Sequence, residues 1–87
     1  MSQNTPNGYE LYNDRKFKEA FDALFDAAAY ENDPEAQYYI GRMYRDGDGV
    51  EKNIDTAIKW WTKARRNGHR DAAFQMSEIQ ISTKNIF

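Results

Sequence analysis

The segment from residue 36 to residue 72 constrains the fold most strongly, because its spacing describes two helices separated by a glycine-rich turn. The second helical stretch ends at Asn67-Gly68, a pair that predicts a helix stop. The apolar pattern then restarts at Ala72, 36 residues after Ala36. A period of this length is typical of helical repeat arrays, in which each unit packs against its neighbours. Such arrays usually bind other proteins.

Apolar residues recur at three- and four-residue intervals in five stretches, and no stretch alternates with the period of a strand. The pattern predicts helices over about 6–13, 17–30, 33–44, 53–67 and 71–83. Asp33, placed before Pro34, is expected to cap the third helix, and Asn53 is expected to cap the fourth. The sequence therefore predicts an all-α fold of about five helices, arranged as antiparallel pairs.

Two local features of the central segment predict details of its packing. Trp61 lies on the same helical stripe as Ala57 and Ala64 and is expected in the core, while its neighbour Trp60 points about 100° away. In the turn, Gly47 and Gly49 stand where positive φ angles are expected.

Several kinds of chemistry find no support in the sequence. There is no cysteine, which excludes disulfides and thiolate metal sites. The one histidine, His69, falls in a turn and is interpreted as a packing or capping residue. The run 46–49 resembles a calcium loop, but its acidic residues come in the wrong order. No paired carboxylates or nucleophile constellation is visible, so the sequence predicts no enzyme, no cofactor and no metal.

The charge distribution is uneven. The net charge of −2 gives no general attraction to nucleic acid. Acidic residues dominate from Glu10 to Asp48, and basic residues dominate from Glu51 to Asp71. The basic cluster consists of Lys63, Arg65, Arg66 and Arg70. It either complements the carboxyl end of a helix dipole or forms a docking patch for an acidic partner. With no signal peptide and no membrane-length apolar run, a cytoplasmic location is expected.

Small, glycine and aromatic residues between positions 36 and 72 follow a fixed spacing. They are Ala36, Ile40-Gly41, Tyr44, Gly47-Asp48-Gly49-Val50, Asn53, Ala57, Trp60-Trp61, Ala64, Gly68-His69 and Ala72. This pattern resembles the Sel-1-like repeat, a relative of the tetratricopeptide repeat. The resemblance implies a short right-handed α-solenoid forming one domain over residues 1–87. Residues 8–35 would form an N-terminal capping repeat, 36–71 a complete repeat and 72–87 a C-terminal half repeat.

The resemblance also implies a concave inner face lined by the first helix of each unit. The implied inward residues are Tyr9, Tyr12, Asn13, Glu35, Tyr38, Arg42, Arg45, Asp71, Phe74 and Glu78. Of these, the residues expected to bind a partner are Tyr9, Tyr12, Tyr38, Arg42, Arg45, Phe74 and Glu78. Tyr38 and Phe74 are 36 residues apart and occupy equivalent places. They either contact a partner or stack on each other.

The function predicted is that of a non-enzymatic module that binds a peptide or a protein surface in a groove lined by tyrosine and arginine. The alternative is a small dedicated inhibitor or immunity protein, whose acidic surface masks an enzyme or a nucleic-acid channel. A weak homodimer through the C-terminal helix, or a fold-back of the tail at Ile86-Phe87, is also expected, because Phe74 and Ile81 lack a following helix to cover them.

Overall fold

The structure is a computed structural model that describes residues 7–84, with side chains described as far as residue 79. It contains five helices, which are α1 (Gly8–Asn13), α2 (Phe17–Ala29), α3 (Pro34–Asp46), α4 (Ile54–Arg66) and α5 (Arg70–Lys84). No strand occurs within residues 7–84, so the predicted all-α fold is confirmed. The expected tail contact at Ile86-Phe87 and the side chain of Ile81 lie outside the described residues.

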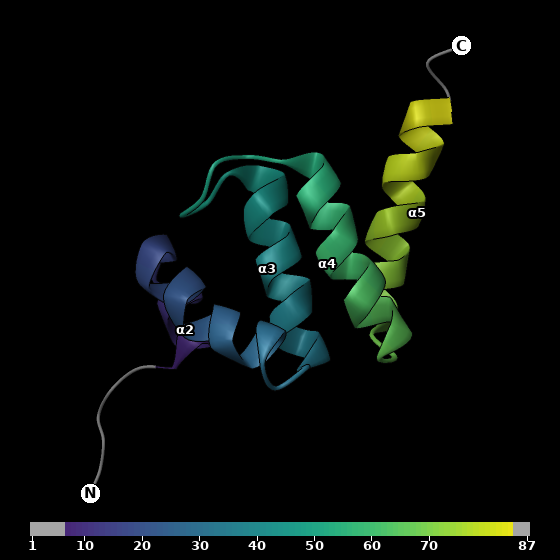
Figure 1. Ribbon diagram of the computed structural model, residues 1–87. Coiled ribbons are helices and arrows are strands. Elements are labelled where there is room, and N and C mark those ends of the chain that lie inside the picture. The colour runs from purple at the N-terminus through teal and green to yellow at the C-terminus, as the bar shows by residue number, and fades with distance from the viewer. Residues whose placement is uncertain (1–6, 85–87) are drawn as a thin grey trace, which may run out of the picture.

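Consecutive helices pack against each other along the whole described chain. In Figure 1, α3, α4 and α5 stand side by side in order, and the turns that join them alternate between the two ends. Neighbouring helices therefore run antiparallel, as a helical repeat requires. α3 is the central element, because it contacts both α2 and α4.

Polar caps set most helix starts. The first helix begins at Gly8 rather than at residue 6, because Asn7 caps it and forms a reciprocal pair of hydrogen bonds with Glu10. The predicted caps are confirmed for α3, where Asp33 accepts from the Glu35 N–H at 3.0 Å. They are also confirmed for α4, where Asn53 accepts from the Thr56 N–H at 3.0 Å.

The core consists of two adjoining clusters. The first lies between α2 and α3 and contains Ala20, Leu24, Ala28, Ala36, Ile40 and Met43. The second lies between α4 and α5 and contains Ala57, Trp61, Ala64 and Ala72. In α2 the helix buries Ala20, Leu24 and Ala28 and leaves Phe21 and Phe25 only partly buried. Small inward residues let α2 and α3 approach closely, while the two rings stack on each other with centroids 5.6 Å apart.

Trp61 is fully buried, as predicted. Its indole lies directly on Gly41 of α3, so that a Cβ atom at that glycine would collide with the ring. Its Nε1–H donates to the carbonyl oxygen of Tyr38 at 3.1 Å. A buried indole needs such a partner for its one donor. The central pair of helices is thus joined by one large ring that packs and donates a hydrogen bond at the same time.

The turn between α3 and α4 confirms the positive φ angles, which are 75° at Gly47 and 80° at Gly49. The N–H of Gly47 donates to the Met43 carbonyl oxygen at 2.8 Å and closes α3. Gly49 lies against the backbone of α2, because a Cβ atom there would be 2.7 Å from the Phe17 carbonyl oxygen. The turn therefore joins the central repeat to the preceding helix pair.

Replacing Trp61 by alanine should lower the free energy of unfolding by about 3–5 kcal/mol, the usual cost of emptying a large aromatic site. Denaturant unfolding of this variant and of Trp60→Ala measures the effect. Trp60 is only partly buried, so its replacement should cost less. Equal losses for the two variants would show that Trp61 is not the central packing residue.

Gly49→Ala should destabilise the chain more than Gly68→Ala. Both glycines have positive φ, a conformation that costs a residue with a side chain about 1–2 kcal/mol. A methyl group at position 68 meets nothing within 4 Å, whereas one at position 49 meets the Phe17 backbone. Comparing the two unfolding midpoints separates backbone strain from collision, and equal midpoints would mean that the turn does not pack on α2.

Candidate functional site

Three tyrosine rings converge on the guanidinium of Arg42. Its Cζ lies 5.2 Å from the ring centroid of Tyr12, 5.7 Å from that of Tyr38 and 5.4 Å from that of Tyr39. Tyr12 comes from α1, and the other residues come from α3. A cation held over aromatic faces is attracted by the ring quadrupoles. The structure thus brings the predicted residues Tyr12, Tyr38 and Arg42 together in what we call the tyrosine–arginine cluster, defined as Tyr9, Tyr12, Tyr38, Tyr39 and Arg42.

Tyr39 is the centre of this cluster and was not among the predicted site residues. Its ring meets Tyr9 and Tyr12 edge-on, with centroids 5.0 Å away in each case. It also meets Tyr38 at 5.9 Å. These contacts attach the short helix α1 to α3. The only signal in the sequence was the pair Tyr38-Tyr39, of which the family pattern marks just the first as inward.

The two predicted arginines differ in their bonding. Arg45 donates to both carboxylate oxygens of Asp46, at 2.8 and 3.0 Å, and to Gln75 Oε1 of α5 at 2.8 Å. The hydrogen bond between Arg45 and Asp46 raises the pKa of the arginine and lowers that of the carboxyl group. The Arg42 guanidinium forms no hydrogen bond or ion pair with any group in residues 7–79. Arg45 therefore bridges helices, while the donors of Arg42 stay available to a ligand.

The remaining predicted residues, Phe74 and Glu78, lie on α5. Phe74 is 60% exposed, and Glu78 is also exposed. The expected stacking of Phe74 on Tyr38 does not occur. Instead Tyr38 stacks on His69, with ring centroids 4.4 Å apart and planes 21° apart. Phe74 and Glu78 make no contact of this kind with the described part of the cluster.

His69 has the capping and packing role that was predicted. Its Nδ1 accepts from the Ala72 N–H at 3.2 Å, at the start of α5. Because Nδ1 accepts, the neutral ring carries its proton on Nε2, which donates to Glu35 Oε1 at 2.7 Å. Glu35 is thereby tied to the corner before α5, so this residue of the implied inner face has a structural contact.

A buried polar network fixes the register of the helix pairs, and the sequence analysis did not predict it. Gln37 is fully buried, and its Nε2 donates to the Ala28 carbonyl oxygen at 3.0 Å and to Asn32 Oδ1 at 2.9 Å. Asn67 Nδ2 donates to Gln37 Oε1 at 3.1 Å. The corner before α3 is thus bonded to the corner before α5. The signal was the recurrence of Asn32 and Asn67 at equivalent corners.

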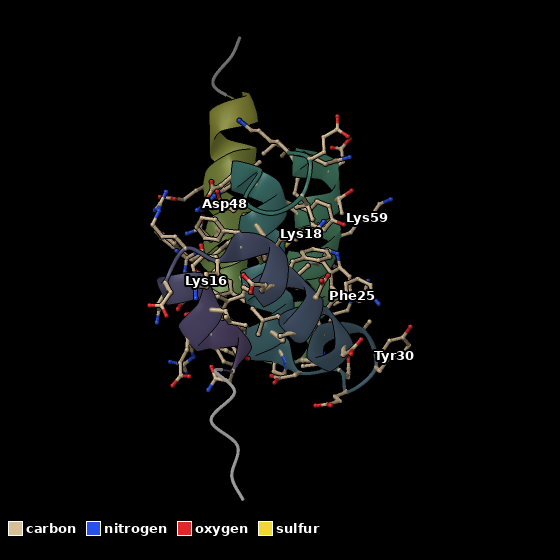
Figure 2. The ribbon with its side chains drawn as sticks, turned by 90° about the vertical axis from the view of Figure 1, so that its left-hand side faces the viewer. Lys16, Lys18, Phe25, Tyr30, Asp48 and Lys59 are labelled. Carbon is tan, nitrogen blue, oxygen red and sulfur yellow. The ribbon has the colours of Figure 1, made fainter. Side chains whose placement is uncertain are left out.

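The two sides of the molecule differ in character. Figure 2 shows Phe25, Tyr30 and Lys59 on one side, with Lys16 and Asp48 on the other. Burial is the largest cause of the raised pKa of Tyr12, and the charge of Asp48 adds to it. The basic residues Lys63, Arg65, Arg66 and Arg70 are all exposed, and the Lys63 ammonium lies 5.5 Å from the Trp60 ring centroid.

The described part of the chain has neither a metal-binding cluster nor a membrane-spanning helix. Within it, no three side chains of histidine, aspartate or glutamate come together in a way that could hold a metal ion. None of the helices in the same range combines the length and apolarity that crossing a bilayer requires.

Residues 34–69 match the Sel1 repeat family. The chain contains a Sel1 repeat. The match runs from the start of α3 to His69, and so includes Gly41, Trp61 and both turn glycines. Sel1 repeats are generally protein–protein interaction modules and are typically non-enzymatic. The division of the flanking residues into a cap at 8–35 and a half repeat at 72–87 stays a prediction.

Two relatives match part of the chain. An exopolysaccharide production negative regulator of Rhizobium meliloti is 42% identical over 48 residues, which is 55% of this chain and 18% of that protein. A sel1-like repeat-containing protein of Acanthamoeba polyphaga mimivirus is 51% identical over 37 residues, which is 42% of this chain and 6% of the relative. The chain thus spans less than a fifth of either relative. No solved structure matches it significantly.

The pKa of Tyr9 should be about 12, because the ring is desolvated by burial and lies near the carboxylates of Asp33 and Glu35. A raised pKa means that the folded state keeps the proton longer than the unfolded state does. The free energy of unfolding should therefore fall as pH rises from about 10 to 12. Spectroscopic phenolate titration of the wild type and of Tyr9→Phe tests this, since the variant should lack the latest-titrating tyrosine. Loss of a phenolate that titrates near pH 10 would contradict it.

Proposed function

We propose that this chain binds another protein through the tyrosine–arginine cluster, and that Arg42 receives a carboxylate of the partner. The observation that carries the proposal is the state of Arg42. Its guanidinium is positioned over three rings, yet it has no ion-pair partner among residues 7–79. A planar guanidinium can donate two parallel hydrogen bonds to a carboxylate while its faces remain stacked.

The composition of the cluster suits a binding site. Tyrosine and arginine are enriched at interface positions whose replacement costs most, because they bury a large area with few torsions to immobilise. Here the rings of Tyr12, Tyr38 and Tyr39 already restrict Arg42 before any partner arrives. Less conformational entropy is then lost on binding. Non-enzymatic binding, rather than catalysis, is the function that this arrangement supports.

The alternative function is inhibition by an acidic surface. In its favour, the carboxylates of the first two helices and their turns are all exposed. They are Glu10, Asp14, Glu19, Asp22, Asp26 and Glu31. Exposed Arg15, Lys16 and Lys18 interrupt them, which weakens the field. Salt distinguishes the two functions, since masking by charge should lose association rate steeply as ionic strength rises.

Two further features of the proposal concern partners and location. Self-association through α5 is supported by the exposure of Phe74, the most exposed apolar side chain described on that helix. A cytoplasmic setting is supported by the absence of cysteine from the sequence.

Arg42→Ala should weaken capture of the partner by about 1–3 kcal/mol and leave the fold intact. The measurement uses the full chain as bait in an extract of its native host, with quantitative mass spectrometry of the captured proteins and circular dichroism of each bait. Arg42→Lys should restore capture only in part, because an ammonium group cannot form the two-pronged bond.

The matched control is Lys63→Ala combined with Arg66→Ala, which removes two exposed charges from α4. Proteins lost with Arg42→Ala but retained by this control would be partners of the cluster. If Arg42→Ala retains every captured protein and the control variant loses them, the binding site lies instead on the basic residues of α4.

A further inference from the structure

We propose that the protein recognised by the tyrosine–arginine cluster is a second copy of this chain, which places Glu78 of its α5 on Arg42 and its Phe74 on the tyrosine rings. This inference rests on the proposed function and names its partner. It uses two features that nothing else in the described structure satisfies. One is the guanidinium of Arg42, which forms no direct ion pair within residues 7–79 although its charge reaches the Asp46 carboxylate, and the other is the exposed face of α5.

The exposed face of α5 combines an apolar and an acidic group. Phe74 is 60% exposed, and Glu78 follows four residues later, so the two side chains lie on one face of the helix. The Glu78 carboxylate forms no hydrogen bond or ion pair within residues 7–79. The face therefore presents one aromatic ring and one carboxylate, the two groups that the cluster is suited to receive.

The same spacing occurs on α3 with the opposite charge. Tyr38 and Arg42 lie two and six residues after the buried Ala36, and Phe74 and Glu78 lie two and six residues after the buried Ala72. The two pairs therefore stand at the same height on successive first helices. The first residue of each pair is aromatic. The second is a cation on α3 and an anion on α5.

A two-fold axis parallel to these helices preserves that height. It places α5 of each copy opposite α3 of the other, so that Arg42 meets the partner copy's Glu78, and Glu78 meets the partner copy's Arg42. The contact between Arg42 and Glu78 therefore forms twice, as an interface between identical subunits requires. Each contact is charge-assisted, and each aromatic ring of α5 meets an aromatic surface.

The contacts within one chain explain why Arg42 does not bond to Glu78 of its own copy. The Arg42 guanidinium leans toward α1, where it is closest to Tyr12 at 5.2 Å. Arg45 already bridges α3 and α5 through its hydrogen bond to Gln75. In the proposed dimer, the carboxylate that pairs with Arg42 therefore comes from the other copy. It approaches the side of the guanidinium that the tyrosine rings leave open.

Sedimentation equilibrium of the full chain, from about 10 µM to 1 mM, tests this pairing. The wild type should form a dimer in this range. Arg42→Glu and Glu78→Arg should each raise the dimer dissociation constant at least tenfold, because like charges then meet across the two-fold axis. An equimolar mixture of the two variants should form a heterodimer, since both cross-copy pairs become attractive again. Lys63→Glu is the matched control and should leave the dimer unchanged, with circular dichroism confirming the fold of each variant.

A wild type that stays monomeric at every concentration would overturn the proposal, and so would a dimer that is insensitive to Arg42→Glu. Failure of the mixture to associate would overturn it as well. Failure of the dimer proposal can be distinguished from failure of the proposed function. A monomer whose capture of a different protein still depends on Arg42 would refute only the second copy as partner, whereas capture independent of Arg42 would refute the proposed function itself.

Discussion

The indole of Trp61 rests on Gly41, and the rest of the structure depends on this contact. The missing side chain at Gly41 lets the ring approach the α3 backbone, and the Nε1–H of the indole holds the Tyr38 carbonyl oxygen at 3.1 Å. This contact fixes α4 against α3 beside Tyr38, a member of the tyrosine–arginine cluster. The Arg45 guanidinium also lies close to this indole, 5.9 Å from the Trp61 ring centroid. A core contact thus positions the surface site.

The two arginines on α3 differ in the contacts that their guanidinium groups make. They are three residues apart, and both carry a full charge near aromatic rings. Arg45 uses its donors on Asp46 and Gln75, and so joins α3 to α5. Arg42 has rings around it and no acceptor within the described residues, so stacking stabilises its position without using its donors. Arg45 is thus bonded within the chain, and Arg42 is the arginine proposed to bind a partner.

Sequence patterns predicted features that depend on one helix or one turn. The caps at Asp33 and Asn53, the positive φ of Gly47 and Gly49, and the burial of Trp61 follow from local rules about hydrogen bonding, sterics and helical period. The Tyr39 contacts could not be predicted, because they depend on how α1 settles against α3. The burial in α2 of Ala20, Leu24 and Ala28 rather than Phe21 and Phe25 likewise depends on the rotation of the helix, which the partner helix decides. The bonds between Asn32, Gln37 and Asn67 join segments that only the complete fold brings together.

The central claim is that Arg42 is held over the tyrosine rings before any partner arrives. Nuclear magnetic resonance of the dilute, uncomplexed chain tests this most directly, through Overhauser contacts from the Arg42 δ-methylene and Nε–H protons. The account predicts contacts to the rings of Tyr12, Tyr38 and Tyr39, with ring-current shifts of these arginine protons to higher field. Arginine protons at ordinary unfolded-chain shifts, without contacts to any of the three rings, would contradict it.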